Sequence, residues 1–244
     1  MIEVKVFKDV KLKGYTLIEG FPGAGLVGPM ANSYIIEKLD MEYIGHIESD
    51  VFPPIAAVHG GVPMFPVRIY KDDKFKVVVI MSEFTIPAEL IYHRGNELIN
   101  FIRKQGIALV VSIGGMPTQK PTDMAYGIGT TKPLMEKLKA AKINPMVEGI
   151  VAGVSAMLLA NGPEFNIPVM DILVPVDPTI MDPKNAVTAI TNLKRVINLN
   201  VSTDELSKEA KLVEAKVKDI MKKARDSHES YKNAVDATGP SMYA

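Results

Sequence analysis

The feature that most constrains the fold is a repeated alternation between short apolar runs and segments that carry helix signals. Runs of five to seven residues rich in Val, Ile and Leu occur at 15–19, 43–48, 76–82, 107–113, 146–152 and 169–174. Such runs are typical of strands buried on both faces of a sheet. Helix signals occupy 29–40, 87–105, 133–141, 155–161 and 183–199. The alternation predicts an α/β fold with a mostly parallel sheet covered by helices on both faces.

Proline and glycine mark the boundaries of several elements. Several expected helices open with Pro in the first turn, and the long one after Pro87 ends at Gly106, which fits the preference for Pro at helix starts and Gly after helix ends. The segment 52–70 is instead rich in Pro and Gly, and 71–74 has the composition of a hairpin turn. We therefore expect an antiparallel insertion near one edge of the sheet.

Composition excludes several classes of function. The chain has 28 Lys plus Arg, 28 Asp plus Glu and no Cys. A balanced charge argues against a nucleic-acid or anionic-membrane partner, and the lack of Cys removes thiolate metal sites and Cys nucleophiles and fits a reducing compartment. The first ten residues lack the apolar core of a signal peptide, so we expect a cytoplasmic protein. The longest apolar stretch, 150–160, is too short to span a bilayer and is interpreted as a buried strand leading into a helix.

The sequence pattern changes after residue 200. Ser202 and Glu205 have the spacing of a capping box at a helix start. A narrow apolar seam follows, formed by Leu206, Ala210, Val213, Val217, Ile220 and Ala224. This seam can pack on the chain's own domain or between subunits, and the sequence leaves both open. We divide the chain into an α/β core domain (1–200), an amphipathic helix (201–235) and a flexible tail (236–244).

A glycine-rich segment follows the first of the expected strands. Gly23, Gly25 and Gly28 match the Gly-x-Gly-x-x-Gly fingerprint, with Glu48 or Asp50 some twenty residues on, so one alternative function is a dinucleotide-binding oxidoreductase. However, 20–22 separate the strand from the first glycine of the fingerprint, where the phosphate-binding turn normally leaves the strand directly. We interpret the glycines, with Gly20, as a structural loop in which backbone passes close to backbone.

A second alternative is a serine hydrolase. Ser155 lies between an expected strand and an expected helix, as a nucleophile does, but the second glycine of Gly-x-Ser-x-Gly is missing. The chain has four His residues, at 46, 59, 93 and 228, and none has a spacing that indicates a metal site or a triad. We therefore expect no catalytic residues, no cofactor and no metal, and predict that the chain is not an enzyme.

The last three residues, Met242, Tyr243 and Ala244, form a hydrophobic-Tyr-any tail. It combines an apolar side chain, a ring with a polar tip and a free carboxylate, which a pocket with one cation can bind together. Gly239 and Pro240 precede it and separate it from any helix. The tail predicts docking to a partner.

Such a tail resembles that of proteasome activators and assembly factors, which dock between α subunits of the core particle. The body of the chain resembles the proteasome assembly chaperone 2 family, particularly its archaeal members, at Gly-Phe-Pro-Gly-Ala-Gly-Leu-Val-Gly (20–28) and Glu-Ser-Asp-Val-Phe-Pro-Pro (48–54). The resemblance implies a three-layer αβα sandwich without catalytic residues. It also implies self-association as a homo-oligomer, or association with a paralogous chaperone.

The function implied is that of an ATP-independent proteasome assembly chaperone, or core-particle binding protein, that docks on the α ring of the 20S proteasome. Met242, Tyr243 and Ala244 would be its docking residues. The sequence from 154 to 157 is less glycine-rich than expected of relatives, and not every member of the family has a docking tail, so the docking inference depends on this chain's own tail.

Overall fold

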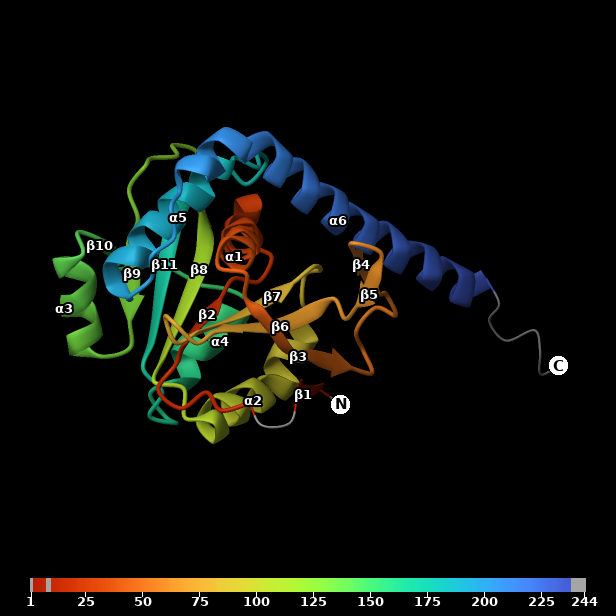
Figure 1. Cartoon of the computed structure of the whole chain (residues 1–244), viewed down its shortest axis with the longest axis horizontal. Helices are drawn as coiled ribbons and strands as arrows, with labels where there is room; N and C mark the ends of the chain where they lie inside the picture. The colour runs from red at the N-terminus through yellow and green to blue at the C-terminus, as the bar shows by residue number, and fades with distance from the viewer. Residues whose placement is uncertain (1, 8–9, 238–244) are drawn as a thin grey trace.

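A nine-stranded mixed sheet runs through the middle of the molecule (Figure 1). The computed structural model describes residues 2–7 and 10–237. The strands are β1 (Ile2–Val6), β2 (Thr16–Glu19), β3 (Glu42–Ser49), β6 (Val67–Asp72), β7 (Val77–Ser82), β8 (Leu109–Pro117), β9 (Tyr126–Gly129), β10 (Asn144–Pro145) and β11 (Val169–Val176). Their order across the sheet is β1-β3-β6-β7-β2-β8-β11-β9-β10. A separate two-stranded ribbon consists of β4 (Ala57–His59) and β5 (Val62–Met64).

The centre of the sheet is parallel and its edges are largely antiparallel. β7, β2, β8 and β11 pair in parallel, as the alternation of strands and helices predicted. On one side β6, β3 and β1 continue the sheet antiparallel, and on the other β9 pairs antiparallel with β11. The predicted hairpin after residue 70 is confirmed, because residues 73–76 form the turn between β6 and β7. The α/β class is therefore confirmed, with antiparallel pairing added at both edges.

Helices cover both faces of the sheet, which confirms the three-layer arrangement. α1 (Val27–Lys38) and α5 (Pro183–Val196) pack on one face, and α6 (Asp204–Ala237) lies against their outer side. α2 (Ala88–Gln105) and α4 (Val154–Asn161) pack on the other face, and α3 (Lys132–Ala140) lies beside β9 and β10. As expected, α2 ends at Gly106, which adopts a left-handed conformation with φ of 67°. Among the described residues, no helix is both long enough and apolar enough to cross a membrane.

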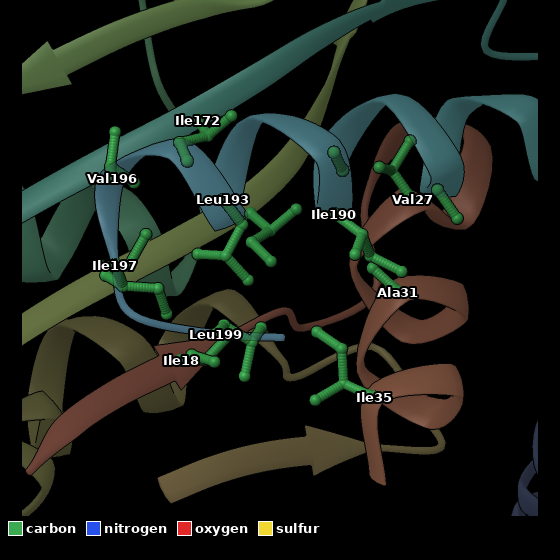
Figure 2. Close-up of a cluster of buried hydrophobic side chains, with 14 of the residues drawn as sticks. Ile18, Val27, Ala31, Ile35, Ile172, Ile190, Leu193, Val196, Ile197 and Leu199 are labelled. Carbon is green, nitrogen blue, oxygen red and sulfur yellow. The ribbon is translucent and has the colours of Figure 1, made fainter. Parts of the chain in front are cut away.

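The larger core lies between the sheet and the pair α1 and α5 (Figure 2). Ile18 and Ile172 point from the sheet towards this layer, where they meet side chains such as Ile35, Ile190 and Leu193, and all five are fully buried. Burial of each such side chain contributes about 1.5–3 kcal/mol. This core fixes α1, and with it the glycine segment that precedes α1, against the carboxyl ends of the parallel strands.

The apolar seam of α6 packs on its own chain over the part that the structure describes. Leu206, Val217 and Ala224 are buried. Leu206 and Val217 belong to the larger core, and Ala224 belongs to the second core of the domain. Tyr34 of α1 fixes the start of the helix, since its hydroxyl donates to the Ser202 carbonyl at 2.9 Å and accepts from the Leu206 amide at 3.2 Å. Ser202 Oγ accepts from the amide of Asp204 at 3.3 Å, and the helix begins at Asp204, two residues after Ser202.

The prediction of a buried strand at 146–152 is wrong. Only Asn144 and Pro145 pair, as the short edge strand β10, and the following residues run in an irregular segment up to Gly153. Val147 is 86% exposed and Ile150 is 94% exposed. The apolar run therefore lies on the surface, and the helix after it begins at Val154.

Candidate functional site

The glycine segment connects the end of β2 with α1, and two of its glycines touch. A Cβ added at Gly20 would lie 2.9 Å from the Cα of Gly28, and one added at Gly28 would lie 2.7 Å from the carbonyl carbon of Gly20. These distances are shorter than real Cβ contacts, so no side chain fits at either position. Between them, Gly25 has φ of 62° within the short 3₁₀ helix η1 (Ala24–Leu26), and an added Cβ there would lie 3.2 Å from the Val176 side chain. The segment is thus a tightly packed crossing of backbone.

This geometry does not resemble a dinucleotide site. Such a site presents the free amides at a helix start to a phosphate, but Val27, Gly28 and Met30 at the start of α1 are buried, and Pro29 has no amide proton. The acidic residue of the fingerprint, Glu48, also lies away from the glycine segment, because it is on β3, which is three places from β2 in the sheet. Glu48 on β3 instead pairs with Lys5 of β1.

The first turn of α4 places Ser155 over the end of β2. Ser155 Oγ donates to Glu19 Oε2 at 3.1 Å, and Glu19 Oε1 accepts from the amide of Phe21 at 2.9 Å. The histidines with hydrogen bonds in the described part of the chain are engaged elsewhere, since His59 contacts Glu83 and His46 contacts Tyr43. Among the described side chains Ser155 therefore has a carboxylate partner and no imidazole, so the structure does not assemble a Ser-His-acid triad there.

Glu19 belongs to a row of buried polar residues that the sequence analysis missed. The register pairs Glu19 of β2 with Ser112 of β8, and Ser112 with Asp171 of β11. All three side chains are at most 1% exposed. Ser112 and Asp171 each interrupt an otherwise apolar strand, and Glu19 is the last residue of β2, which begins with Thr16. These polar residues were the sequence signal for the row, but their proximity becomes evident only from the register of the three strands.

The row is electrostatically costly. Burial raises the pKa of the Glu19 carboxyl, and the Phe21 amide and the neighbouring hydroxyl groups oppose that rise. Burial, and then the charge of Glu19, raise the pKa of Asp171 to about 7, against a smaller opposing effect of the Ile172 amide. Ser112 Oγ lies close enough to Glu19 to oppose the rise in the pKa of that carboxyl. However, neither Ser112 Oγ nor either carboxylate oxygen of Asp171 makes a hydrogen bond of normal geometry to a described residue. Two carboxyl groups thus share a site with few hydrogen-bond donors.

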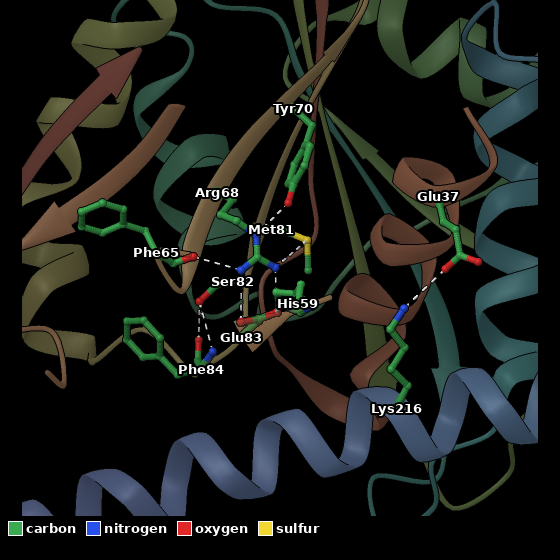
Figure 3. A network of polar contacts seen from close by, with 10 residues as sticks. All are labelled: Glu37, His59, Phe65, Arg68, Tyr70, Met81, Ser82, Glu83, Phe84 and Lys216. Carbon is green, nitrogen blue, oxygen red and sulfur yellow. Dashed lines mark hydrogen bonds and ion pairs between the residues drawn. The ribbon is translucent and has the colours of Figure 1, made fainter. Parts of the chain in front are cut away.

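A second polar cluster lies beneath α6 (Figure 3). Arg68 of β6 is buried and binds Glu83 at 2.6 and 3.2 Å, while its Nε donates to the Tyr70 hydroxyl at 2.7 Å. Burial alone would lower the pKa of Arg68, but the hydrogen bond and charge of Glu83 outweigh it and raise the pKa overall. His59, on the ribbon, contacts the same Glu83 carboxylate at 2.7 Å. The network ties the ribbon to the main sheet.

Next to this cluster, a cavity of about 230 Å³ separates α6 from the sheet. Val217 and Met221 of α6 form part of its wall, opposite Arg68 and Tyr70, and Lys216 bridges to Glu37 of α1 at 3.5 Å. α6 therefore packs closely on α5 and α1 but spans a hollow over β6 and β7.

The structure does not place the predicted docking residues. Met242, Tyr243 and Ala244 lie outside the described residues, as do Gly239 and Pro240. Among the residues that are described, no group of three or more His, Cys, Asp or Glu side chains is arranged to hold a metal ion.

The fold and these sites define a three-layer α/β protein whose glycine segment is packed within the domain and whose last long helix reaches beyond it. The model of the PAC2 family matches residues 17–221, which is most of the chain. The chain therefore belongs to the PAC2 family, as the resemblance at 20–28 and 48–54 predicted.

Relatives of similar length support this assignment. The chain is 28% identical to the uncharacterized protein MJ0106 of Methanocaldococcus jannaschii, over 91% of this chain and 94% of the relative. Among solved structures, Pyrococcus furiosus PbaA, described as an archaeal homolog of proteasome-assembly chaperone, has a TM-score of 0.84 at 24% identity and covers 93% of this chain and 99% of its own.

Two further solved structures share the fold. A Thermoplasma acidophilum protein of unknown function has a TM-score of 0.81 at 29% identity, covering 90% of this chain and 91% of its own. Pyrococcus furiosus PbaB, described as an archaeal proteasome activator, has a TM-score of 0.74 at 19% identity, covering 90% and 98%.

Proposed function

We propose that this protein is an ATP-independent proteasome assembly chaperone that docks on the α ring of the 20S core particle through Met242, Tyr243 and Ala244. The observation that carries the proposal is the PAC2 family match over 17–221, combined with a hydrophobic-Tyr-any tail on the same chain. The description of PbaA as a homolog of proteasome-assembly chaperone, and of PbaB as a proteasome activator, favours the same class of partner.

The long last helix suits this role. α6 has 34 residues and is therefore about 51 Å long at 1.5 Å per residue. Its first half packs on the domain, while residues 225–230 are all exposed and the helix runs outward past the ribbon (Figure 1). α6 thus ends away from the body, which suits a short tail that has to reach a pocket on a large partner.

The body would carry the chaperoning itself, without a nucleotide. The packed crossing of Gly20 and Gly28 and the buried start of α1 support a structural role for the glycine segment. We further propose that the protein works in the cytoplasm as a homo-oligomer, or with a paralogous chaperone. Its formal net charge of zero fits a partner that is neither a nucleic acid nor a membrane.

The experiment is a binding titration of the full chain against immobilised archaeal 20S core particles by interferometry. Deletion of residues 242–244, or Tyr243→Ala, should weaken binding at least tenfold, because the ring supplies packing area and its hydroxyl a hydrogen bond. Ser241→Ala is the matched control, since it changes the tail just outside the docking residues, and it should bind like the wild type. Wild-type affinity in both tail variants would place the docking surface on the body and refute the proposed role of the tail.

A further inference from the structure

The cavity between α6 and the sheet has no role in the proposed docking. It is open to solvent and has a volume of about 230 Å³. Since an apolar cavity of about 150 Å³ holds one benzene ring, this cavity can hold a molecule of about ten non-hydrogen atoms. Its wall consists largely of Met and branched aliphatic side chains, and the thioethers of Met adapt to the shape of a ligand. These apolar side chains are Ile36, Met64, Met81, Val217, Ile220 and Met221.

Arg68 brings one incompletely used donor to this cavity (Figure 3). The residue is 2% exposed, and its two Nη atoms donate to the carboxylate of Glu83 and to the carbonyl of Phe65. The remaining proton on Nη2 faces only the sulfur of Met81, at an N–S distance of 3.8 Å. A thioether is a weak acceptor. An oxygen atom of a ligand would therefore be a better partner for this proton than Met81 is.

The hydroxyl of Tyr70 is a second donor of this kind, and Tyr70 lines the same cavity. The hydroxyl accepts from Arg68 Nε at 2.7 Å, and its own proton has no acceptor among the described residues. Burial raises the pKa of Tyr70, although the charge and the hydrogen bond of Arg68 oppose the rise, so the hydroxyl keeps its proton near neutral pH. Because the two donor groups are in direct contact, one oxygen with two lone pairs can accept from both.

The charges around Arg68 favour a neutral ligand. Glu83 binds Arg68 through both carboxylate oxygens, at 2.6 and 3.2 Å, and so already neutralises it. Lys216, which also lines the cavity, pairs with Glu37 at 3.5 Å. A second carboxylate would add an uncompensated charge beside a buried ion pair, which is unfavourable. The carbonyl oxygen of a ketone or an amide adds no charge and can accept the two available protons.

We propose that this cavity binds a small neutral molecule with an apolar body and one carbonyl oxygen. The apolar body lies between Val217 and Met221 of α6 and the strands β6 and β7. The carbonyl oxygen accepts from the Tyr70 hydroxyl and from Arg68 Nη2. This inference goes beyond the proposed function and does not depend on docking to the proteasome.

Binding would fill the hollow beneath the middle of α6. The helix packs on α5 and α1 along its own side of the cavity, and through the ligand Val217 and Met221 would gain contact with the sheet. The exposed last part of the helix continues from this point. The backbone amides of 216–221 should therefore exchange more slowly with solvent when the cavity is occupied.

The test is a titration of the full-length protein at pH 8 with three probes of similar size, followed by ligand-observed NMR. Acetophenone has a neutral carbonyl, ethylbenzene lacks it, and benzoate carries a charge instead. Acetophenone should bind with a Kd on the order of 1 mM, as expected for so small a molecule. It should bind about fivefold more tightly than ethylbenzene and about tenfold more tightly than benzoate. Tyr70→Phe should remove most of the preference for acetophenone over ethylbenzene, without weakening the binding of ethylbenzene.

Tyr43→Phe is the matched control, because the Tyr43 ring lies 5.6 Å from that of Tyr70 but does not line the cavity, and it should keep the full preference. Ser33 lines the cavity, so Ser33→Leu should abolish binding of every probe by filling the space, whereas Ser33→Ala should not. If Tyr70→Phe fails to fold, the three probes on the wild type and the two Ser33 variants decide. No saturable binding of acetophenone, equal or tighter binding of ethylbenzene or benzoate, or unchanged binding in Ser33→Leu would overturn the proposal. None of these results affects the docking experiment.

Discussion

At the scale of single residues, the glycine segment shows how little space the fold allows. Gly20 and Gly28 exclude a Cβ by contact with each other's backbone, whereas an added Cβ at Gly23 meets nothing within 4 Å. Gly23 also has an extended backbone that any residue can adopt. Substitutions at Gly20, Gly23 and Gly28 can therefore distinguish a structural role of the segment from the phosphate-binding role that the fingerprint suggests.

We predict that Gly28→Ala lowers the free energy of unfolding by about 1–3 kcal/mol, because the backbone must move to admit the methyl group. Gly23→Ala should change it by less than about 0.5 kcal/mol. Urea unfolding followed by circular dichroism measures both. Equal effects of the two substitutions would contradict the packed crossing, and micromolar binding of NAD or ATP in calorimetry would contradict a purely structural loop.

A second prediction concerns Asp171, whose pKa rises from its ordinary value of 3.8 to about 7 on folding. The folded state then holds a proton that the unfolded chain releases, so the stabilisation is present below about pH 4 and is lost as the pH rises to about 7. Asp171→Asn should become more stable relative to wild type over this range, by an amount on the order of a few kcal/mol. Chemical unfolding at a series of pH values measures the difference.

Asp177 provides the control, since it follows the same strand but is partly exposed, and hydrogen bonds from Thr179 lower its pKa. Asp177→Asn should give a small difference of opposite sign, present above about pH 4 and lost on acidification. An Asp171→Asn curve that runs parallel to the wild type throughout would show that Asp171 does not hold a proton in the folded state.

The acidic row also shows what the sequence alone could not reveal at this scale. In the sequence, Ser112 and Asp171 each look like an isolated polar residue in a buried strand and Glu19 like the polar end of one, and an isolated carboxylate has no preferred partner. Their proximity depends on register between strands whose residues are far apart in the chain. In contrast, the contact of Gly20 with Gly28 is local, and the glycine pattern itself indicated it.

At the scale of elements, α6 is the one whose role the sequence left open. Leu206 and Leu212 lie on the same helix, but Leu206 is fully buried in the core and Leu212 is 73% exposed. We predict that Leu206→Ala lowers the free energy of unfolding by about 2–5 kcal/mol, and that Leu212→Ala changes it by less than about 0.5 kcal/mol. Denaturant unfolding compares them. A similar small loss in both would mean that α6 is not packed on its own domain.

Element prediction succeeded where the pattern was periodic and failed where only composition was available. The central strands and all five helices before residue 200 were recognised, because flanking Pro, Gly and turn residues marked their limits. The run at 146–152 has the same apolar composition as a buried strand, yet Val147 and Ile150 face solvent. Apolar composition favours burial, but the local sequence does not indicate whether a neighbouring strand is available for pairing. The short strands β1, β9 and β10 were not predicted, and β1 was missed although its apolar and charged residues alternate.

At the scale of the whole molecule, one tail of three residues orders little surface and should bind weakly. Several tails on one body raise the effective concentration of each and increase the overall affinity. We therefore predict a closed homo-oligomer. Light scattering at micromolar concentration should give a mass several times the 26.6 kDa of one chain. A mass of one chain at all concentrations would remove the argument from multiple tails.

The central claim, that the chain docks on the proteasome core particle through its last three residues, is tested most directly by adding one Gly after Ala244. The addition keeps every side chain but moves the terminal carboxylate by up to about 3.5 Å, away from a pocket cation. We predict that interferometry against immobilised core particles gives at least tenfold weaker binding than the wild type, with unchanged Tm and oligomer mass. Binding of the extended chain with wild-type affinity would contradict the claim.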